Sequence, residues 1–432
     1  MIDTTAIYIL MGVFILLMFL GVHIVYALAI SSILTTLYLG LPLQLLVQNM
    51  INQLNSFALL AVPFFILAGN IMAVGGITDR LVKFANSIIG WLRGGLAQVN
   101  IMASMFFGGI SGSAAADTAS IGSIMIPTMK KNGYDGEFST SITMASSVQG
   151  LLIPPSHNMV LFAIAAGGVS VGRLFLGGLV PGILLGVALM IFSYIVSIKK
   201  KYPKGDRFNF KVLLRELYNS IFGLGTVLIV VVGVITGIFT PTESAAIACV
   251  YAFIIAFFVY KEAPISAMGK VLIDTLKTLS IVLIIACAAS AFGWLIAYLH
   301  VPAFLLEILT SISSNKIVIL LLINLFLLFL GTFMNMVSSI LIVTPILLPV
   351  VVDLGMDPVH FGVVLILNLG IGLITPPVGT LLFIGSSISK LSVEQLTKSM
   401  LPFYTVMIIV LLIVTFIPEF SMIIPDLIMP VE

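Results

Sequence analysis

Long, almost uninterrupted runs of apolar residues dominate this chain, and short polar segments separate them. An apolar run of about 20 residues can cross the hydrocarbon core of a bilayer as a helix. Such runs cover residues 7–38, 57–74, 174–198, 221–239, 244–260, 279–299, 317–334 and 402–424. The pattern predicts an all-α polytopic membrane protein with about ten to twelve crossings, some of them incomplete.

Three further apolar regions do not resemble simple spans. Region 94–129 is rich in Gly, Ser and Ala, whereas prolines interrupt regions 137–170 and 337–388. Proline lacks a backbone N–H and disfavours helical geometry in the residue before it. We therefore expect helices that are broken within the membrane.

An internal repeat relates the two halves of the chain. A shift of 222 residues, without gaps, aligns Phe107 with Phe329, Gly109 with Gly331, Pro127 with Pro349, Gly133 with Gly355, Asp135 with Asp357, Gly150 with Gly372, and Pro154-Pro155 with Pro376-Pro377. Most of these residues are Gly or Pro, which shape the backbone. Two related halves with broken helices are typical of secondary transporters. Basic residues follow the first broken segment and Asp353 ends its counterpart, which fits inverted repeats.

The longest polar stretch, residues 199–218, divides the chain near its midpoint. It holds seven basic and two acidic residues, which predicts a cytoplasmic loop. Two amphipathic stretches, 78–93 and 263–278, fit either arms along the membrane surface or ordinary loop helices. No basic residue precedes Arg80, so the first apolar run is expected to be a retained span and not a cleavable signal peptide.

Composition excludes several other classes of protein. Of all residues, 60% are hydrophobic and 8% are charged, whereas soluble domains carry about 25% charged residues. The net charge of +2, without a basic stripe interleaved with aromatics, does not favour nucleic-acid binding. Cys249 and Cys287 lie in apolar runs, and the four histidines match no metal-ligand spacing. The phosphate-binding motif GxxxxGK[ST] does not occur, which argues against ATP hydrolysis.

The first broken segment contains a buried charge. Asp117 is the only charged residue between Gly94 and Met129, and an ionised group at membrane depth costs at least ~2.5 kcal/mol unless it is paired or solvated. The small residues Gly108, Gly109 and 111–116 allow a tight turn whose exposed carbonyls need a cation or another partner. This predicts a re-entrant hairpin with Asp117 near its tip. The alternatives are that Asp117 caps a helix and that the small residues serve close helix packing.

The double prolines predict a second set of free oxygens. Pro154 and Pro155 would leave carbonyls of residues 150–153 partly unpaired, and unwound helices of this kind bind sodium; a simple proline kink is the alternative. In the second half, Asn335 aligns with Ser113, and Thr375 precedes the prolines. These neutral oxygen donors favour sodium over a proton relay. Glu243 follows Thr-Pro-Thr and is expected in the first turn of a helix, in a structural role.

These segments resemble the large membrane subunit of tripartite ATP-independent periplasmic (TRAP) transporters, the DctM-like proteins. The resemblance runs from about Leu59 to Met407 and includes VPFFILAGNIM, GGITDRLVKFA, RGGLAQVNIMASM, GGISGSAAADTASIG, GYDGEF, GIFTPTESAA, TPILLPV, DPVHFG and NLGIGLITPPVGT. The stretch GLLIPPSHNMVLF resembles the sialic-acid (SiaM-like) and sugar-acid branch more than the dicarboxylate branch, which more often has GPIIPPS.

The resemblance implies a sodium-driven elevator-type transporter of the bacterial inner membrane. A periplasmic substrate-binding protein (DctP- or SiaP-like) would deliver a small organic acid, with sialic acid or another sugar acid favoured over a C4-dicarboxylate. A small four-helix membrane subunit (DctQ- or SiaQ-like) would complete a heterodimer. The alternatives are a channel or a proton-coupled or binding-protein-independent carrier on the same scaffold. An intramembrane enzyme would need paired carboxylates, whereas Asp117 stands alone.

The resemblance also implies a division into scaffold and transport domains. We expect N-terminal scaffold helices and an arm in 1–93, the first transport repeat in 94–172, central scaffold helices with a second arm in 173–278, helices leading into the second repeat in 279–316, the second transport repeat in 317–400, and a C-terminal scaffold helix in 401–432.

The family's two sodium sites transfer residue by residue. One would use Ser111, Asp117 and the carbonyls of Gly150, Ile153 and Pro155; the other would use Asn335 and the carbonyls of Gly372, Thr375 and Pro377. The family usually has Asp where this chain has Asn335, so a second sodium ion is left open. Candidate hydrogen-bond donors to the acid substrate are Ser113, Ser156, Asn158 and Thr380.

Overall fold

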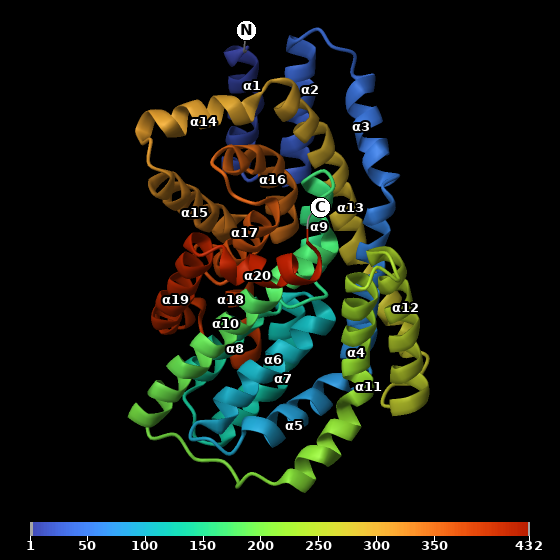
Figure 1. The fold of residues 1–432 in the computed structure, drawn as a ribbon, viewed down its shortest axis with the longest axis vertical. Coiled ribbons are helices and arrows are strands. Elements are labelled where there is room, and N and C mark those ends of the chain that lie inside the picture. Colours follow the sequence, from blue (N-terminus) through green and yellow to red (C-terminus); the bar gives the residue numbers. More distant parts are fainter. Residues whose placement is uncertain (1–2, 431–432) are drawn as a thin grey trace.

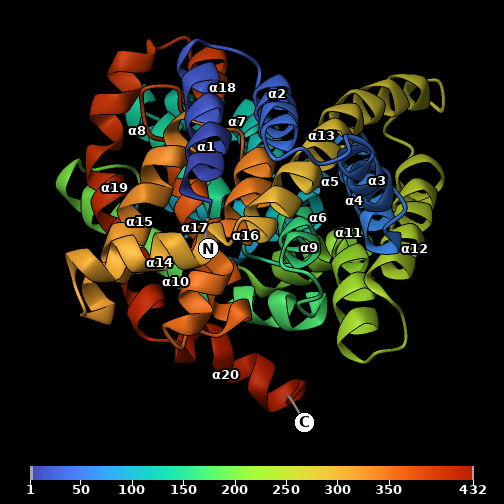
Figure 2. The same cartoon turned by 90° about the horizontal axis from the view of Figure 1, so that it is seen from above.

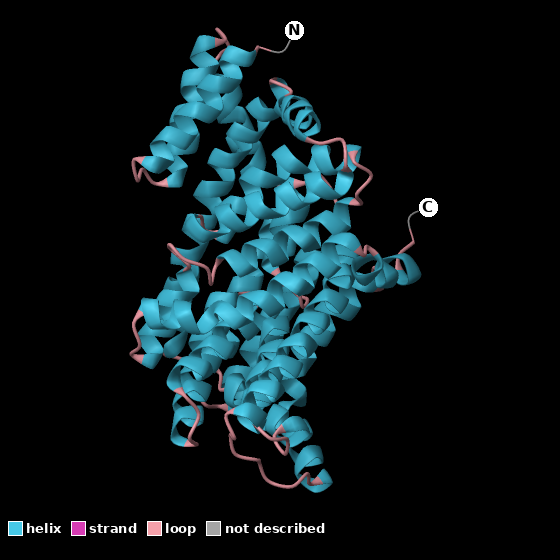
Figure 3. Ribbon diagram, turned by 90° about the vertical axis from the view of Figure 1, so that its left-hand side faces the viewer, coloured by secondary structure: helices cyan, strands magenta, loops and turns pink. Residues whose placement is uncertain are grey.

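The computed structural model describes residues 3–430, and helices make up nearly all of them (Figure 3). The described residues contain no strand; Arg93 and Lys204 form an isolated bridge. The helices are α1 (Thr4–Phe19), α2 (Ile24–Tyr38), α3 (Gln44–Leu54), the 3-10 helix η1 (Phe57–Leu60), α4 (Ala61–Val74), α5 (Ile77–Ile89), α6 (Gly95–Ser111), α7 (Ala114–Lys131), α8 (Gly136–Gln149), α9 (His157–Ala165), α10 (Val171–Lys199), α11 (Phe210–Ile235), α12 (Pro241–Ile254), the π-helix η2 (Ile255–Tyr260), α13 (Ala267–Tyr298), α14 (Val301–Ile312), α15 (Lys316–Phe333), α16 (Met336–Asp353), α17 (Pro358–Gly372), α18 (Thr380–Ser389), α19 (Val393–Phe416) and α20 (Glu419–Ile428).

The predicted all-α membrane fold is confirmed. Eight helices in the described part of the chain are long and apolar enough to cross a membrane, and five shorter apolar helices accompany them. Many large apolar side chains are exposed on the outer helices, for example Phe19, Tyr218 and Ile238. Such a surface would be unstable in water, so lipid must surround it.

The helix boundaries repeat with the spacing found in the sequence. A shift of 222 residues maps both ends of α7 onto both ends of α16, and the first residues of α8 and α10 onto those of α17 and α19. The residues that precede these helices also match, because Asp135 corresponds to Asp357 and Ser170 to Ser392. The two halves are therefore structural repeats.

The repeats are inverted. Helix α5 and its counterpart α14 both lie across the long axis of the molecule, but at opposite ends (Figure 1). Helix α14 lies near the N-terminus, whereas α5 lies beside the basic connection between α10 and α11. The two halves therefore have opposite orientations in the membrane.

The helices pack in two groups. Helices α1–α5 and α11–α14, here called the frame, include the neighbouring pairs α4–α12, α3–α13 and α5–α11. Helices α6–α10 and α15–α20, here called the hairpin body, contain both broken segments. Figure 2 shows α3, α4, α11 and α12 gathered on one side and α15 and α19 on the other.

The two halves interlock inside the hairpin body. Helix α7 of the first half packs against α18 of the second half, and α16 of the second half packs against α9 of the first. Each hairpin also crosses the helix that precedes its own double proline through a pair of glycines. A Cβ atom on Gly150 would lie 2.7 Å from the Cα of Gly108, and one on Gly331 would lie 3.0 Å from the Cα of Gly372. The backbones therefore touch.

Several predicted boundaries were wrong. The apolar run 7–38 is not one span but two antiparallel helices, α1 and α2, because the chain reverses at Gly21 (φ 76°). The stretch 263–278 does not form an arm, since Ala267 begins the 32-residue helix α13. The run 402–424 is divided between α19 and α20 next to Pro418. Hydropathy averaged over a long apolar run does not reveal a single residue at which the chain changes direction.

The helices at 171–199 and 393–416 also pack differently from the sequence-based division. Helix α10 contacts α6, α8, α17 and α19, and α19 contacts α8, α17 and α18. Both therefore belong to the hairpin body, although 173–199 and 401–416 were grouped with the scaffold. Their uniform hydrophobicity could not reveal which neighbours they meet.

The glycine crossing gives a prediction for stability. Gly331→Ala should lower the free energy of unfolding by about 1–3 kcal/mol, because its Cβ would press on the backbone of Gly372. Gly269→Ala is the matched control, since no heavy atom lies within 4 Å of a Cβ at Gly269. The measurement is thermal unfolding of the purified protein in detergent; equal melting temperatures for the two variants would contradict the close packing.

Candidate functional site

The first hairpin turns between α6 and α7 through two residues. Gly112 has the left-handed conformation (φ 58°), which favours glycine, and a Cβ there would lie 3.0 Å from the carbonyl oxygen of Pro155. Ser113 is the N-cap residue of α7, and its hydroxyl accepts a hydrogen bond from the backbone N–H of Ala116 (3.3 Å). Capping of α7 is thus performed by Ser113, and the alternative that Asp117 serves as this cap is wrong.

Asp117 lies in the first turn of α7 and is completely buried. Its Oδ1 accepts a hydrogen bond from the hydroxyl of Ser104 on α6 (3.1 Å), whereas its Oδ2 has no hydrogen-bond partner among the described residues. A Cβ on Gly150 would lie 3.6 Å from this Oδ2, so the free oxygen lies beside the end of α8. A buried carboxylate oxygen without a donor is costly unless a cation or a proton meets it.

The segment that follows α8 supplies unpaired carbonyl groups. Helix α8 ends at Gln149, and the chain turns through residues 150–155 before α9 begins. Within the described structure, no backbone N–H donates to the carbonyls of Gly150, Ile153 or Pro155. The peptide bond between Pro154 and Pro155 is cis, as is the one between Pro376 and Pro377. The expected break in the helix is therefore present in both halves.

The hairpin tip and this turn are docked together. The side-chain amide of Asn158 donates a hydrogen bond to the carbonyl of Gly112 (3.0 Å), and a Cβ on Gly112 would lie 3.0 Å from the Cα of Ser156. The packing therefore brings together the segments that hold all five residues of the first predicted sodium site and three of the four substrate candidates. Those residues are Ser111, Asp117, Gly150, Ile153 and Pro155, with Ser113, Ser156 and Asn158.

The second hairpin resembles the first but uses neutral groups, and the carbonyl of Gly372, unlike that of Gly150, accepts a hydrogen bond from the N–H of Thr375 (2.9 Å). Asn335 is the N-cap of α16, and its Oδ1 accepts a hydrogen bond from the N–H of Val337 (2.9 Å). The N–H of Gly379 donates to the carbonyl of Thr332 (3.3 Å), which docks this tip on the second proline turn. The hydroxyl of Thr375 donates to the carbonyl of Ile371 (2.8 Å).

This second arrangement is more open than the first. Asn335, Pro377 and Thr380 are exposed, Thr375 is half-buried and Gly372 is buried. The position equivalent to Asp117 is Ser339, so the second half has no buried carboxylate at this depth. The two halves thus share a backbone plan but differ in charge.

A chain of buried polar residues behind Asp117 was not anticipated from the sequence. The hydroxyl of Ser104 also meets the hydroxyl of Ser146 (3.1 Å), which in turn bonds Asn100 Oδ1 (3.5 Å); Asn100 donates to Thr143 (2.6 Å). All four residues are fully buried. One signal was available: the repeat aligns Ser146 with Asn368, which donates to Asn324 in the second half (2.5 Å).

The structural role predicted for Glu243 is confirmed. Its Oε2 accepts a hydrogen bond from the backbone N–H of Thr240 (2.8 Å), and the Thr240 hydroxyl accepts one from the N–H of Glu243 (3.2 Å). This reciprocal pair is a capping box at the start of α12. Glu243 therefore does not contribute to the sites at the hairpins.

Comparison with known proteins adds family information. The family model for the DctM component of the tripartite ATP-independent periplasmic transporter matches residues 11–420. An isethionate TRAP transporter permease from Oleidesulfovibrio alaskensis is 40% identical over 96% of this chain and 65% of its own length. A sialic acid TRAP transporter large permease from Vibrio cholerae is 39% identical over 88% of this chain and 89% of that protein. A C4-dicarboxylate TRAP transporter large permease from Pseudomonas aeruginosa is 39% identical over 86% of each chain.

A solved structure supports the fold at lower sequence identity. The YdaH transporter of Alcanivorax borkumensis superposes with a TM-score of 0.64 at 14% identity, covering 88% of this chain and 89% of that one. At this identity the likeness concerns the fold alone.

The contact between Ser104 and Asp117 gives a second prediction. Ser104→Ala should reduce the free energy of unfolding by about 1–3 kcal/mol, because Oδ1 of the buried carboxylate loses its donor. Ser123→Ala on α7 is the control, since that exposed hydroxyl bonds only the carbonyl of Ser120 among the described residues. Thermal unfolding of the two variants side by side tests this, and a wild-type melting temperature for Ser104→Ala would refute it.

Proposed function

This chain belongs to the DctM family, the large membrane component of tripartite ATP-independent periplasmic transporters, and we propose that it imports a small organic acid by using a sodium gradient. It is a multi-pass membrane transport protein and not an enzyme. The observation that carries the proposal of sodium coupling is the buried, unpartnered Oδ2 of Asp117 beside unpaired carbonyls.

Sodium fits the first site because its donors are all oxygens. The Asp117 carboxylate, the Ser111 hydroxyl and the carbonyls of the turn after α8 would hold the ion as a co-transported substrate. Broken helices in other secondary transporters bind sodium through such unwound carbonyls. A proton on Asp117 is the alternative, and it would leave the carbonyls of Gly150, Ile153 and Pro155 without a partner.

The second site is proposed as a weaker sodium site. Its side-chain ligand, Asn335, is neutral, exposed and already engaged by the N–H of Val337. An amide oxygen attracts a cation less than a carboxylate does, because it carries only a partial charge. We propose that this site fills at a higher sodium concentration than the first.

An elevator-type movement is supported by a difference between the inverted halves. In the second half, α16 packs against the frame helices α13 and α14. In the first half, α7 has no comparable packing on α4. A cavity of about 490 Å³ lies there, with Thr78 and Asp79 on one wall and Ala119, Ser120 and Ser123 of α7 on the other. We propose that the halves exchange these two arrangements as the hairpin body slides.

The orientation follows from charge. The opening beside α7 lies near α5, at the end that also carries the basic connection between α10 and α11. Basic connections face the cytoplasm in membrane proteins. The structure is therefore proposed to represent the state that is open toward the cytoplasm.

The substrate would meet helix N-termini and hydroxyl groups near the hairpin tips. Helices α7 and α9 begin side by side, and helix N-termini attract carboxylates. The hydroxyl of Ser156 is buried and has no hydrogen-bond partner in the described structure, so it is a candidate donor together with Ser113, Asn158 and Thr380. Asn158 also has a structural role, because its amide holds the hairpin tip.

Sialic acid or another sugar acid is proposed first, because the segment GLLIPPSHN resembles the sialic-acid and sugar-acid branch of the family more than the dicarboxylate branch. Relatives named for isethionate, sialic acid and C4-dicarboxylates are almost equally similar to this chain, so overall identity does not separate the substrates. The word tripartite in the family description supports two partners, proposed as a small four-helix membrane subunit and a periplasmic substrate-binding protein.

The function is tested by uptake into proteoliposomes. The chain and its small subunit would be reconstituted together, and the binding protein would be supplied with radiolabelled sialic acid, isethionate or succinate. Uptake of one acid that requires both an inward sodium gradient and the binding protein is expected. Uptake driven by a proton gradient alone, or without the binding protein, would support the alternative carrier.

Asp117 should determine the sodium requirement. Asp117→Ala is expected to raise the sodium concentration for half-maximal uptake by about tenfold or more, because the only charged ligand is lost. Glu243→Gln is the control, since that carboxylate caps α12 away from the hairpins. An unchanged sodium dependence in Asp117→Ala would exclude Asp117 as a ligand.

Asn335→Asp should have the opposite effect. A carboxylate retains the capping bond to Val337 and adds a charge at the second site, so half-maximal uptake should require several-fold less sodium. Ser313→Asp, three residues before α15 begins and at the other end of that helix from Asn335, adds the same charge away from the site. The measurement is the sodium dependence of uptake, and equal responses of both variants would point to a general charge effect.

A further inference from the structure

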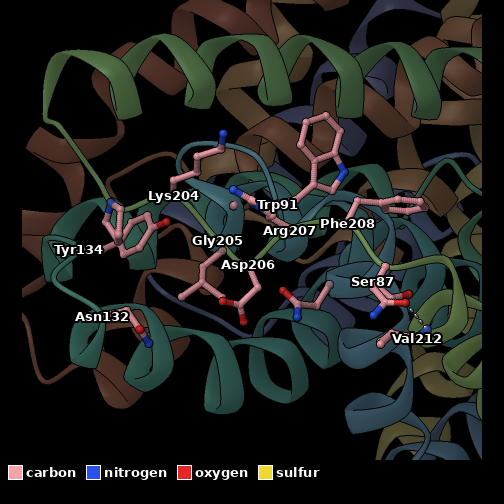
Figure 4. Close-up of a pocket in the computed structure, with 16 residues that line it drawn as sticks. Ser87, Trp91, Asn132, Tyr134, Lys204, Gly205, Asp206, Arg207, Phe208 and Val212 are labelled. Carbon is pink, nitrogen blue, oxygen red and sulfur yellow. Dashed lines mark hydrogen bonds between the residues drawn. The ribbon is translucent and has the colours of Figure 1, made fainter.

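A cavity of about 520 Å³ lies beside the basic connection between α10 and α11 (Figure 4). It includes the start of α6, whereas the first hairpin tip follows the other end of that helix. Its walls come from the end of α5, the start of α6, the base of the first hairpin and the connection itself. Trp91, Tyr134, Lys204, Arg207 and Phe208 line it. Nothing in the transport cycle described above uses these residues.

The connection is held in place and forms a built wall of the cavity. The N–H of Gly94 donates to the carbonyl of Pro203 (2.9 Å), and Arg93 Nε donates to the carbonyl of Tyr202 (3.3 Å). The hydroxyl of Tyr202 donates to Asp135 (2.8 Å), which also pairs with Lys200. The hydrogen bond from Lys200 lowers the pKa of the Asp135 carboxyl, which favours its ionised form.

The cavity carries positive charge and hydrogen-bond donors. Lys204 and Arg207 form no ion pair with any described residue, and Asp206 is the only acidic residue in the lining. Asn86 and Asn132 line the same space, and the side-chain amide of Asn132 also donates a hydrogen bond to the carbonyl of Thr128 (2.8 Å). Two cations against one carboxylate, with amide donors beside them, favour an anion.

One wall continues onto an apolar surface. Val212 lines the cavity, and the side chains around it on the same stretch are exposed: Phe208 by 50%, Phe210 by 61% and Leu214 by 51%. Trp91, which is 41% exposed, is of the type that settles at the level of lipid headgroups. A positively charged cavity thus continues into an apolar surface. A ligand with a phosphate at one end and hydrocarbon at the other fits this arrangement better than a soluble anion does.

We propose that this cavity binds the phosphate-bearing headgroup of an anionic phospholipid from the cytoplasmic leaflet, with Lys204 and Arg207 as its charged ligands. The acyl chains would then lie along the exposed apolar side chains at the start of α11. Asn86 lies in the frame helix α5 and Trp91 follows that helix, whereas Asn132 and Tyr134 follow α7 at the base of the first hairpin. A bound lipid would therefore contact both groups of helices.

Native mass spectrometry of the full-length chain in detergent tests the proposal. We expect phosphatidylglycerol to bind more tightly than phosphatidylcholine. Lys204→Gln with Arg207→Gln should weaken phosphatidylglycerol binding about 25-fold, because each cation near the surface contributes about fivefold. The matched control is Lys211→Gln with Arg215→Gln, which removes the same charge from α11 outside the cavity.

Three outcomes would overturn the proposal. Equal loss in both double variants would mean diffuse attraction and no site. Equal binding of the two lipids would exclude recognition of charge. Displacement of phosphatidylglycerol by inorganic phosphate that binds with equal affinity would mean that the cavity binds a soluble anion. A second measurement uses Trp91 as the only tryptophan in a Trp294→Phe background; brominated phosphatidylglycerol should quench its fluorescence more than brominated phosphatidylcholine, and equal quenching would contradict the proposal.

Discussion

The requirement that every backbone polar group find a partner in the bilayer governs this structure. Two helices in the hairpin body stop at double prolines and leave carbonyls that no described N–H satisfies. The tips of the two hairpins dock on these turns, through Asn158 and Gly112 in the first half and through Thr332 and Gly379 in the second. The cation binding proposed here follows from that arrangement, because the turns at the double prolines offer free carbonyl oxygens where an intact helix would offer none.

The inverted repeat gives both halves the same backbone plan, and the side chains make them unequal. Asp117 introduces a buried charge that its counterpart Ser339 lacks, and Asn335 caps α16 with a neutral amide where Ser113 caps α7 with a hydroxyl. The packing differs too, since α16 packs along the frame helix α13, whereas α7 has no comparable packing on α4 and a cavity lies between them. Equivalent elements in two different environments are what an alternating-access cycle between inverted halves requires. A charged, buried first site and a neutral, open second site would also bind their ions with different strength.

The cavity beside the basic connection shows a different use of charge. At the hairpins a single carboxylate lies in a dry interior, where one oxygen without a partner strongly favours a cation. Near the membrane surface, Lys204 and Arg207 are exposed to water and each contributes modestly, so binding there depends on the aromatic and apolar surfaces around them. The hairpin sites lie within the hairpin body, whereas the cavity lies where that body meets the frame helix α5 and the basic connection.

The sequence by itself determined the membrane class, the repeat and the broken segments, because apolar runs, Gly and Pro act locally on the chain. It also singled out Asp117 and Asn335, since a polar residue within an apolar run stands out without any structure. Only the tertiary structure decided what those residues meet: that Ser104 holds one oxygen of Asp117, that Ser113 and not Asp117 caps α7, and that α10 and α19 join the hairpin body. The reversal at Gly21 and the start of α13 at Ala267 were missed for the same reason. Segments distant in sequence decide which groups a side chain contacts and which neighbours a uniformly apolar helix packs against. The hydropathy pattern along the chain does not contain this information.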